Sequence, residues 1–535
     1  MLRSAEAVTL NTLAYPVVAI AMDRNAVHGY HSGRSFIVRP GDPPLRTAST
    51  SGSLYQALAD ELTVAITSGR LPAGSNLPSL RECAAKRKLS LNTVTAAYRL
   101  LEDRGLIVAR PQSGFYVCSD LPEPQYSLRS IPKDAVGEAQ QDLMSLVLEA
   151  QHRPGHLDLA FAGPRGRRFY PGERLARLTN SVLKRHTDLI TAYALPPGSD
   201  LLREQIARRS RRLGMTLSAN DIVLTHGAVE ALHLALRAVT RSGDYVGIEA
   251  PSYFNLYPLL SSLGLKAIEI PTHPQQGLDV DAVEKLLCEK RVTALVVMPT
   301  VHNPLGCTMP IGEKQRLAKL VNQHSVPLIE DTVYAELQYV EPLEPAVKAF
   351  DRKGWIMVCA GFSKTLAPDY RLGWIDGGRF GDVIQRLKFS ASASESMLLS
   401  ETIGLFLKSG GYEHHLRGLR RLYFSQVAAT RGLIAQHFPV GTRATQPTGG
   451  FVLWIELPPV VDSLKLFHAA LAEGIVTMPG QVYSKGPRYR HCLRLSCCQE
   501  MDQRYTDAVR TLGRLACALA GERNERPKAP SSPLR

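Results

Sequence analysis

The stretch CAGFSKTLAPDYRLGW, residues 359–374, specifies the fold of the larger part of this 535-residue chain. It follows a short apolar segment, residues 355–358, that reads as a strand, and it presents Lys364 on a tight polar turn. Arg371 follows seven residues later. This arrangement suits a lysine that forms a Schiff base beside an anchor for a phosphate group.

Around this stretch, segments typical of strands alternate with segments typical of helices from about residue 155 onward. Such alternation predicts an α/β domain with a largely parallel sheet. The sequence near residues 449–455 changes character and predicts a smaller α+β lobe at the C-terminus. We expect strands at residues 222–224, 245–248, 294–298, 327–329 and 356–358, and helices at 229–239 and 314–322.

The region before this domain predicts three helices and a hairpin. Apolar residues recur every four positions over residues 54–67, which indicates one helix face. Ser79 and Glu82 form a capping-box pattern at the start of a second helix, and Ser90 caps a third that Gly105 ends. Residues 106–109 and 115–118 then alternate as two short strands. Three helices and a two-stranded wing make a winged helix-turn-helix.

These patterns divide the chain into five parts. Residues 1–52 read as a flexible arm, 53–119 as the winged helix, and 120–150 as a proline-containing linker with a helical second half. Residues 151–520 form the α/β body, and 521–535 a disordered tail.

Composition limits the classes of function. The net charge of +14 favours polyanionic partners such as nucleic acid, although solubility alone explains it equally well. No apolar run reaches the ~20 residues that a membrane span needs, and residues 1–22 lack a signal-peptide pattern. We therefore expect a cytoplasmic protein without membrane contact. The nine cysteines include a cluster near residues 492–498 without zinc-site spacing, so we expect reduced thiols and no metal.

Residues 77–85 and 90–102, LPSLRECAA and SLNTVTAAYRLLE, resemble the GntR-type winged helix, and the resemblance covers residues 54–118. Short polar side chains at the start of the third helix can meet base edges or phosphates of operator DNA. Family members often carry arginine where this chain has Leu91. The alternative is a helical dimerisation module. The candidate DNA-binding residues are Arg81, Ser90, Leu91, Asn92, Thr93, Thr95 and Gly114.

Residues 155–515 resemble the fold-type-I, aspartate-aminotransferase-like enzymes that use pyridoxal 5′-phosphate. Joined to the winged helix in this order, they resemble the MocR branch of the GntR regulators. The resemblance implies that Lys364 carries the cofactor as a Schiff base and that Asp331 pairs with the pyridinium nitrogen. Asn303 and Tyr334 would bind the ring hydroxyl, and Tyr253 would stack on the ring.

The resemblance also indicates which residues would bind the cofactor phosphate and which would bind the substrate. Backbone amides of Gly227, Ala228 and Val229 at a helix N-terminus would hold the phosphate, together with Ser363 and Arg371. Arg494 would grip a substrate carboxylate. Tyr193 would reach the phosphate of the partner subunit, which implies a domain-swapped homodimer.

Two positions depart from the family pattern. Gly361 stands where the family usually places Ser or Thr against the phosphate, and Asp369 replaces a small residue and is expected to put a negative charge near it. We expect a transcriptional regulator that senses the cofactor, or a small amine or amino acid bound to it. The alternatives are a working aminotransferase with an accessory winged helix and a structural dimer without cofactor.

Overall fold

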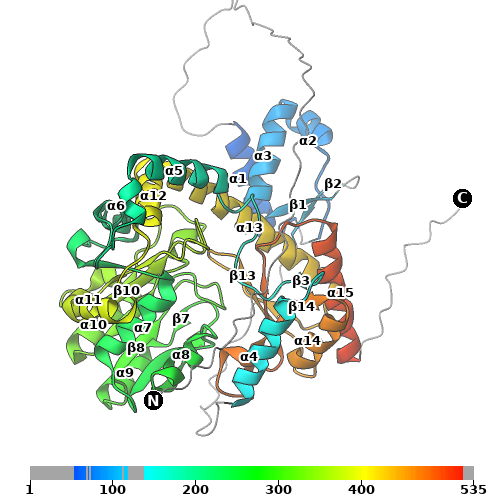
Figure 1. Cartoon of the computed structure of the whole chain (residues 1–535). Coiled ribbons are helices and arrows are strands. Elements are labelled where there is room, and N and C mark those ends of the chain that lie inside the picture. The colour runs from blue at the N-terminus through cyan, green and yellow to red at the C-terminus, as the bar shows by residue number, and fades with distance from the viewer. Residues whose placement is uncertain (1–53, 68–69, 72–73, 111–113, 119–137, 522–535) are drawn as a thin grey trace, which may run out of the picture. The chain divides into compact units, whose positions relative to one another are not determined.

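The computed structural model of the chain describes residues 54–67, 70–71, 74–110, 114–118 and 138–521 (Figure 1). The predicted arm at residues 1–52 and the predicted tail beyond Gly521 lie outside the described residues. Most of the predicted linker does so as well. Among the described residues, no helix is both long and apolar enough to cross a membrane.

The N-terminal module has the three helices and the hairpin that the sequence predicts. Helix α1 supplies the buried Leu58 and Leu62, which share one core with Val94 and Tyr98 of α3. The two strands pair antiparallel and close this core. The elements are α1 (Leu54–Thr67), α2 (Leu80–Arg87), α3 (Leu91–Asp103), β1 (Ile107–Arg110) and β2 (Gly114–Val117).

Both predicted caps form, and they fix where α2 and α3 begin. The Glu82 amide donates to Ser79 Oγ at 3.3 Å, and the Ser79 amide donates to Glu82 Oε2 at 2.9 Å. The Thr93 amide donates to Ser90 Oγ at 3.1 Å. Each cap satisfies amides that the first helical turn leaves without partners.

The body is built on an eight-stranded sheet in the order β4-β11-β10-β9-β8-β5-β6-β7. The neighbours β10 and β9, β9 and β8, β8 and β5, and β5 and β6 pair parallel. Strand β11 runs antiparallel to both of its neighbours, so the largely parallel sheet is confirmed. The strands are β4 (Ile222–Thr225), β5 (Tyr245–Ala250), β6 (Lys266–His273), β7 (Gly277–Leu278), β8 (Ala294–Val297), β9 (Leu328–Asp331), β10 (Ile356–Gly361) and β11 (Gly373–Asp376).

Helices cover both faces of this sheet (Figure 1). Successive residues of β9 point to opposite faces of the sheet. Ile329 packs with α7, α8 and α11 on one face, whereas Leu328 packs with α9 and α10 on the other. Burial on both sides explains why the strands read as continuous apolar runs. These helices are α7 (Gly227–Val239), α8 (Leu256–Ser262), α9 (Val280–Cys288), α10 (Ile311–His324) and α11 (Gly381–Ser392).

The C-terminal lobe is the α+β unit that the sequence predicts. Its sheet has the order β12-β13-β16-β15 and is antiparallel throughout. It shares one core with the long helix α13 and with α14 and α15. The elements are β12 (Arg443–Ala444), β13 (Val452–Glu456), β15 (Met478–Pro479), β16 (Cys492–Ser496), α13 (Gly411–His437), α14 (Ser463–Ala472) and α15 (Gln503–Ala520).

The helical second half of the linker is α4, which starts four residues before the predicted 142–150 segment. Its Val147 and Ala150 are buried against Trp454 and Phe467 of the C-terminal lobe. The packing of residues 143–150 against this lobe stabilises a helix for which the local sequence signal is weak. The remaining elements of the body are α4 (Glu138–Gln151), β3 (Leu157–Asp158), α5 (Gly172–Arg185), α6 (Asp200–Ser210), α12 (Met397–Lys408) and β14 (Ile475–Val476).

Candidate cofactor and DNA-binding sites

A cavity of about 260 Å³ lies where the parallel strands of the body end. Asp331 is the last residue of β9, Gly361 is the last of β10, and both line it. Ligands of α/β proteins bind at this edge because loops from several strands converge there. Of the residues predicted for the cofactor and substrate, the cavity wall contains Ala228, Val229, Tyr253, Asn303, Asp331, Tyr334, Ser363, Lys364, Arg371 and Arg494.

Lys364 lies on the turn after β10 and points its ammonium at the backbone of another segment. Its Nζ donates to the carbonyl of Ala162 and lies 5.6 Å from the ring centroid of Phe161. Desolvation lowers the pKa of Lys364 to about 8, and the nearby Arg494 guanidinium acts in the same direction. A larger share of the amine is therefore neutral at physiological pH than for an ordinary lysine.

Asp331 is buried and accepts a hydrogen bond from the Val333 amide at 2.9 Å. Burial is the main cause that raises the pKa of Asp331 to about 7; the Val333 amide opposes this rise and the Glu249 carboxylate contributes to it. The carboxylate is therefore ready to accept a cationic partner, which would restore its ordinary acidity.

Arg494 is fully buried on β16 and joins the two lobes at the cavity. Its Nη1 donates to Asn303 Oδ1 at 3.2 Å, and its Nη2 donates to the Ala160 carbonyl. Its Nε has no hydrogen-bond partner among the described residues. The Tyr334 hydroxyl is likewise buried in the described part of the chain without a partner. Buried polar atoms are rarely left without partners unless a ligand or water serves them.

The opposite end of the cavity is built for an anion. Helix α7 begins at Gly227, whose φ is +77°, and a Cβ there would lie 2.9 Å from Arg371 Nη2. Arg371 Nη1 donates to Ser363 Oγ at 3.2 Å. A helix N-terminus beside a guanidinium provides amide donors and positive charge for a phosphate.

The structure accounts for the two departures from the family pattern. A Cβ at Gly361 would lie 3.3 Å from the Ala228 amide nitrogen, so glycine allows β10 to approach α7 closely. Asp369 is exposed and does not line the cavity. The wall of the cavity therefore does not include Asp369, and the effect of its charge on a bound phosphate stays a prediction. Tyr193 also lies outside the cavity and is 94% exposed.

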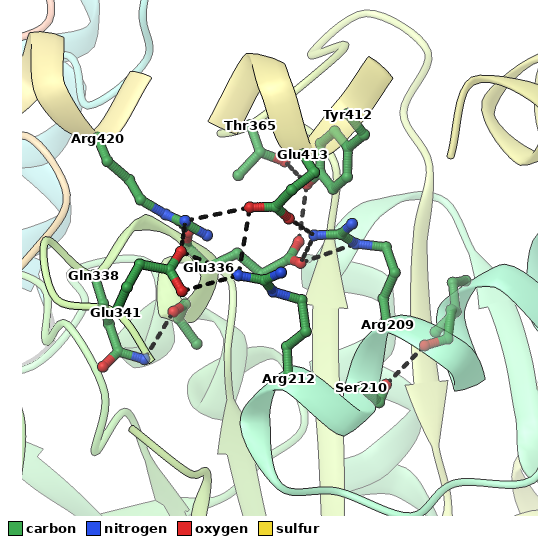
Figure 2. Close-up of polar contacts among 12 residues, drawn as sticks. Arg209, Ser210, Arg212, Glu336, Gln338, Glu341, Thr365, Tyr412, Glu413 and Arg420 are labelled. Carbon is green, nitrogen blue, oxygen red and sulfur yellow. Dashed lines mark hydrogen bonds and ion pairs between the residues drawn. The ribbon is translucent and has the colours of Figure 1, made fainter. Parts of the chain in front are cut away.

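Sequence reasoning missed a network of charged side chains and hydroxyls that includes Thr365, the residue after Lys364 (Figure 2). Arg209 Nε donates to Glu336 Oε1 at 3.0 Å, and the Tyr412 hydroxyl lies 2.9 Å from Glu336 Oε2. Glu336 belongs to the short helix Ala335–Leu337, directly after Tyr334. The arginines and glutamates are far apart in the sequence, so no local pattern could have identified them.

A second group that the sequence did not reveal surrounds the start of α7. His226, Glu230 and Glu395 lie close enough together to hold a cation. The fully buried Lys388 already supplies one, with its Nζ 2.8 Å from Glu230 Oε2 and in contact with Glu395. The His226 amide donates to Glu230 Oε2 at 2.6 Å. This ion cluster therefore fixes the first turn of α7.

The predicted DNA-binding residues gather at the start of α3 and on the elements beside it. Leu91 is 46% exposed, and Arg81 and Asn92 are also exposed. Thr95 Oγ1 donates back to the Leu91 carbonyl at 2.8 Å. Ser90 and Thr93 are partly engaged in the cap of the helix. Gly114 opens β2 with φ +98°, a conformation that favours glycine.

Comparisons with known proteins agree with both halves of the chain. Residues 170–512 match aminotransferase class I and II, and residues 54–117 match the bacterial regulatory proteins of the gntR family. The HTH-type transcriptional regulator YdcR of Escherichia coli (strain K12) is 36% identical over 86% of this chain and 98% of that protein. Aromatic-amino-acid aminotransferase 1 of Thermococcus litoralis is 28% identical over 64% of this chain and 84% of that enzyme.

Among solved structures, LysN, an α-aminoadipate aminotransferase of Thermus thermophilus, is similar with a TM-score of 0.65 and 25% identity. The similarity covers 72% of this chain and 98% of LysN, which was solved with N-(5′-phosphopyridoxyl)-L-leucine. The chain belongs to the aminotransferase class I and II family and carries a GntR-type DNA-binding domain at its N-terminal side. It is a GntR-type transcriptional regulator joined to an aminotransferase-like domain whose relatives depend on pyridoxal phosphate, as predicted.

The residues present fit that cofactor. The cavity wall contains the guanidinium of Arg371 for an anion, a buried carboxylate at Asp331, and Lys364, whose pKa is lowered to about 8. The unpartnered hydroxyl of Tyr334 is a donor that a ring oxygen would satisfy. This donor set matches a phosphate, a protonated ring nitrogen, an aldehyde and a phenolic oxygen.

Proposed function

We propose that the protein is a MocR-type transcriptional regulator that binds operator DNA and senses pyridoxal phosphate, an amine or an amino acid. One observation carries this: Lys364, Asp331, Arg371 and Arg494 line a single cavity in a chain that also contains a winged helix. In this proposal residues 53–119 read DNA, 120–150 link, and 151–520 bind the effector.

Each residue of the cavity then has a role toward the cofactor. Asp331 holds the ring nitrogen in its protonated form, and Asn303 and Tyr334 bind the ring oxygen. Tyr253 packs on the ring. The amides of residues 227–229 bind the phosphate with Ser363 and Arg371. The bound cofactor supplies an electron sink, and Lys364 is the residue to which it attaches.

Toward the effector, Arg494 binds a carboxylate. Its Nε has no partner among the described residues and is available to one oxygen of that carboxylate. Lys364 would accept or donate a proton at Nζ while it is not attached to the cofactor, because its pKa of about 8 lies near physiological pH. Arg494 is buried, so a carboxylate bound to it would be shielded from water.

The regulatory step is a shift between two conformations of the body. An amine that displaces Lys364 binds one conformation better, and this differential affinity biases the DNA-binding state. We place the protein in the cytoplasm as a domain-swapped homodimer in which Tyr193 contacts the partner's phosphate. The exposure of Tyr193 leaves it free for such a contact.

A gel-shift titration tests this function. The full-length chain, with and without pyridoxal phosphate, is mixed with DNA from its own promoter region while amines and amino acids are added. We expect binding whose affinity changes with one class of amine, and loss of that response in Lys364→Ala. Absence of DNA binding under every condition would overturn the proposal.

The second candidate is an active aminotransferase that carries an accessory winged helix. The buried Arg494 at the cavity favours it, because a substrate carboxylate is what such an arginine binds in transamination. Sustained turnover with an amino donor and a 2-oxo acid, lost in Lys364→Ala, would support the enzyme. A single half-reaction without turnover would support the sensor.

A further inference from the structure

The cavity has only four charged side chains among the described residues, and each already has a role. Asp331 and Arg371 face the two ends of the cofactor, Lys364 attaches it, and Arg494 binds one carboxylate. A second carboxylate or ammonium on the effector would therefore enter the site without a matching charge from this chain. A buried charge without a partner is strongly unfavourable.

The rest of the wall toward α4 is apolar except for Gln151, whose Nε2 donates to Asp158 Oδ1 at 3.5 Å. Met144 and Leu148 are four residues apart and so lie on the same face of α4, one turn from each other. Phe161, Phe254 and Met478 complete this apolar surface from three other segments. These side chains are large and carry no hydrogen-bonding groups that a polar side chain could use.

A second cavity, of about 480 Å³, shares Met144, Leu148 and Phe254 with the first. These three side chains therefore lie between the two cavities. Methionine has three rotatable bonds and a polarisable thioether, and it adapts its shape to different apolar neighbours. Lys266 and Lys485 line the second cavity but not the first, so an effector side chain that stays within the first cavity meets the three shared side chains and neither lysine. A rotation of Met144 would adapt this apolar wall to side chains of different shape.

We propose that the effector is an α-amino acid with one carboxylate and an uncharged apolar side chain, which packs against Met144, Leu148 and Phe254. This inference rests on the proposed function, since it assumes that the cofactor binds at Lys364 and that Arg494 takes the carboxylate. It also identifies the segment that senses the side chain. Helix α4 forms the second half of the linker, so occupancy of this surface acts on the part of the chain that leads to the DNA-binding domain.

The experiment is a titration of the cofactor-loaded, full-length protein with leucine, methionine and phenylalanine, and with aspartate, glutamate and lysine. The change in cofactor absorbance gives a dissociation constant for each, and the shift in thermal midpoint gives an independent one. We expect the apolar amino acids to bind at least about tenfold more tightly than the charged ones, because a site matched in polarity discriminates by this order.

Two variants locate the selectivity on α4. Met144→Arg should weaken leucine binding and strengthen aspartate and glutamate binding, because it adds a cation to the apolar wall. Glu149→Gln changes the net charge by the same amount at an exposed position of α4 that lines neither cavity, and it should bind as wild type does. If Met144→Arg does not fold, Leu148→Arg repeats the test at a residue that is 44% exposed.

The outcomes separate this inference from the function on which it rests. Tighter binding of aspartate, glutamate or lysine by the wild-type protein would overturn the inference, and so would a loaded protein that responds to no amino acid. In both cases cofactor and DNA binding would still stand. Failure to take up the cofactor at all would remove the sensing function, and the inference with it.

Discussion

The Tyr412 hydroxyl lies 2.7 Å from Thr365 Oγ1, and Thr365 directly follows Lys364 in the chain. The same hydroxyl lies 2.9 Å from Glu336 Oε2 (Figure 2). Glu336 follows Tyr334 by two residues in the sequence. Helix α13 therefore holds two of the segments that carry cofactor residues. His415, one turn further along α13, adds a contact of 2.8 Å from Nε2 to the Thr365 carbonyl.

Tyr412→Phe should loosen the turn of Lys364 without unfolding the protein. It removes the hydroxyl and leaves the ring in the core, and Glu336 keeps its contact with Arg209. We expect the affinity for pyridoxal phosphate, measured by absorbance titration, to fall about 3–10-fold, as for the loss of one buried hydrogen bond.

The matched control for that variant is Tyr423→Phe on the same helix. Its hydroxyl is buried without a hydrogen-bond partner among the described residues, so its removal should leave cofactor affinity unchanged. Equal losses in both variants would mean that α13 responds to any change in its core and that the Thr365 contact has no special role.

The rate at which pyridoxal phosphate attaches to Lys364 should depend on pH, because the lysine loses its proton as the pH rises. Only the neutral amine is nucleophilic, and the pKa of Lys364 is lowered to about 8 by desolvation. The rate of absorbance change after mixing the empty protein with pyridoxal phosphate should therefore rise about tenfold from pH 7 to 9 and then level off. Nα-acetyl-lysine measured in parallel corrects for titration of the cofactor itself. A rate that still rises tenfold per pH unit above pH 9 would contradict the lowered pKa.

Asp331→Asn should stabilise the empty protein at high pH while it weakens cofactor binding. In the folded protein, burial raises the pKa of the Asp331 carboxyl to about 7, above its ordinary value. The contribution of this carboxyl to the free energy of unfolding is therefore fully present below pH ~4 and is lost as the pH rises through 7. At pH 8 the thermal midpoint of the empty variant should exceed that of wild type by about 2–4 °C, and at about pH 4 the two should nearly coincide.

Asp369→Asn serves as the control for that comparison, since Asp369 is exposed and outside the cavity. It should change neither the midpoint nor the affinity for pyridoxal phosphate, whereas Asp331→Asn should lower that affinity at least about tenfold. An Asp331→Asn protein that is less stable than wild type at pH 8 would show that the Asp331 charge is compensated in the empty site.

In the DNA-binding domain, Asn92→Ala and Ser90→Ala should differ in their effect on stability. Asn92 is exposed in the first turn of α3, so its loss should weaken operator binding about tenfold without changing the thermal midpoint. Ser90 caps the same helix, so its loss should also destabilise the domain by about 1 kcal/mol. Gel shifts and thermal unfolding separate the two. Unchanged binding in Asn92→Ala would remove that residue from the DNA contact.

Local signals in the sequence were sufficient for the secondary structure that positions both sites. The caps at Ser79 and Ser90 predicted the starts of α2 and α3, because a cap acts on amides two or three residues away. Motif order predicted that Asp331, Asn303, Lys364 and Arg371 share one site, and the cavity brings them together. The side-chain direction of Asp369 was not predictable in this way, since a turn can point a residue to either side.

The elements, their α/β order and the chemical groups of the candidate site follow from the amino-acid sequence alone, because caps, periodicity and motifs act within a few residues. The contacts that these groups make with residues far away in the sequence are decided only by the tertiary structure. Tyr412 and Thr365 are 47 residues apart, and Arg494 reaches Asn303 across 191 residues. The lowered pKa of Lys364 and the raised pKa of Asp331 also depend on folding, since both result from burial in one cavity that segments from the whole body enclose.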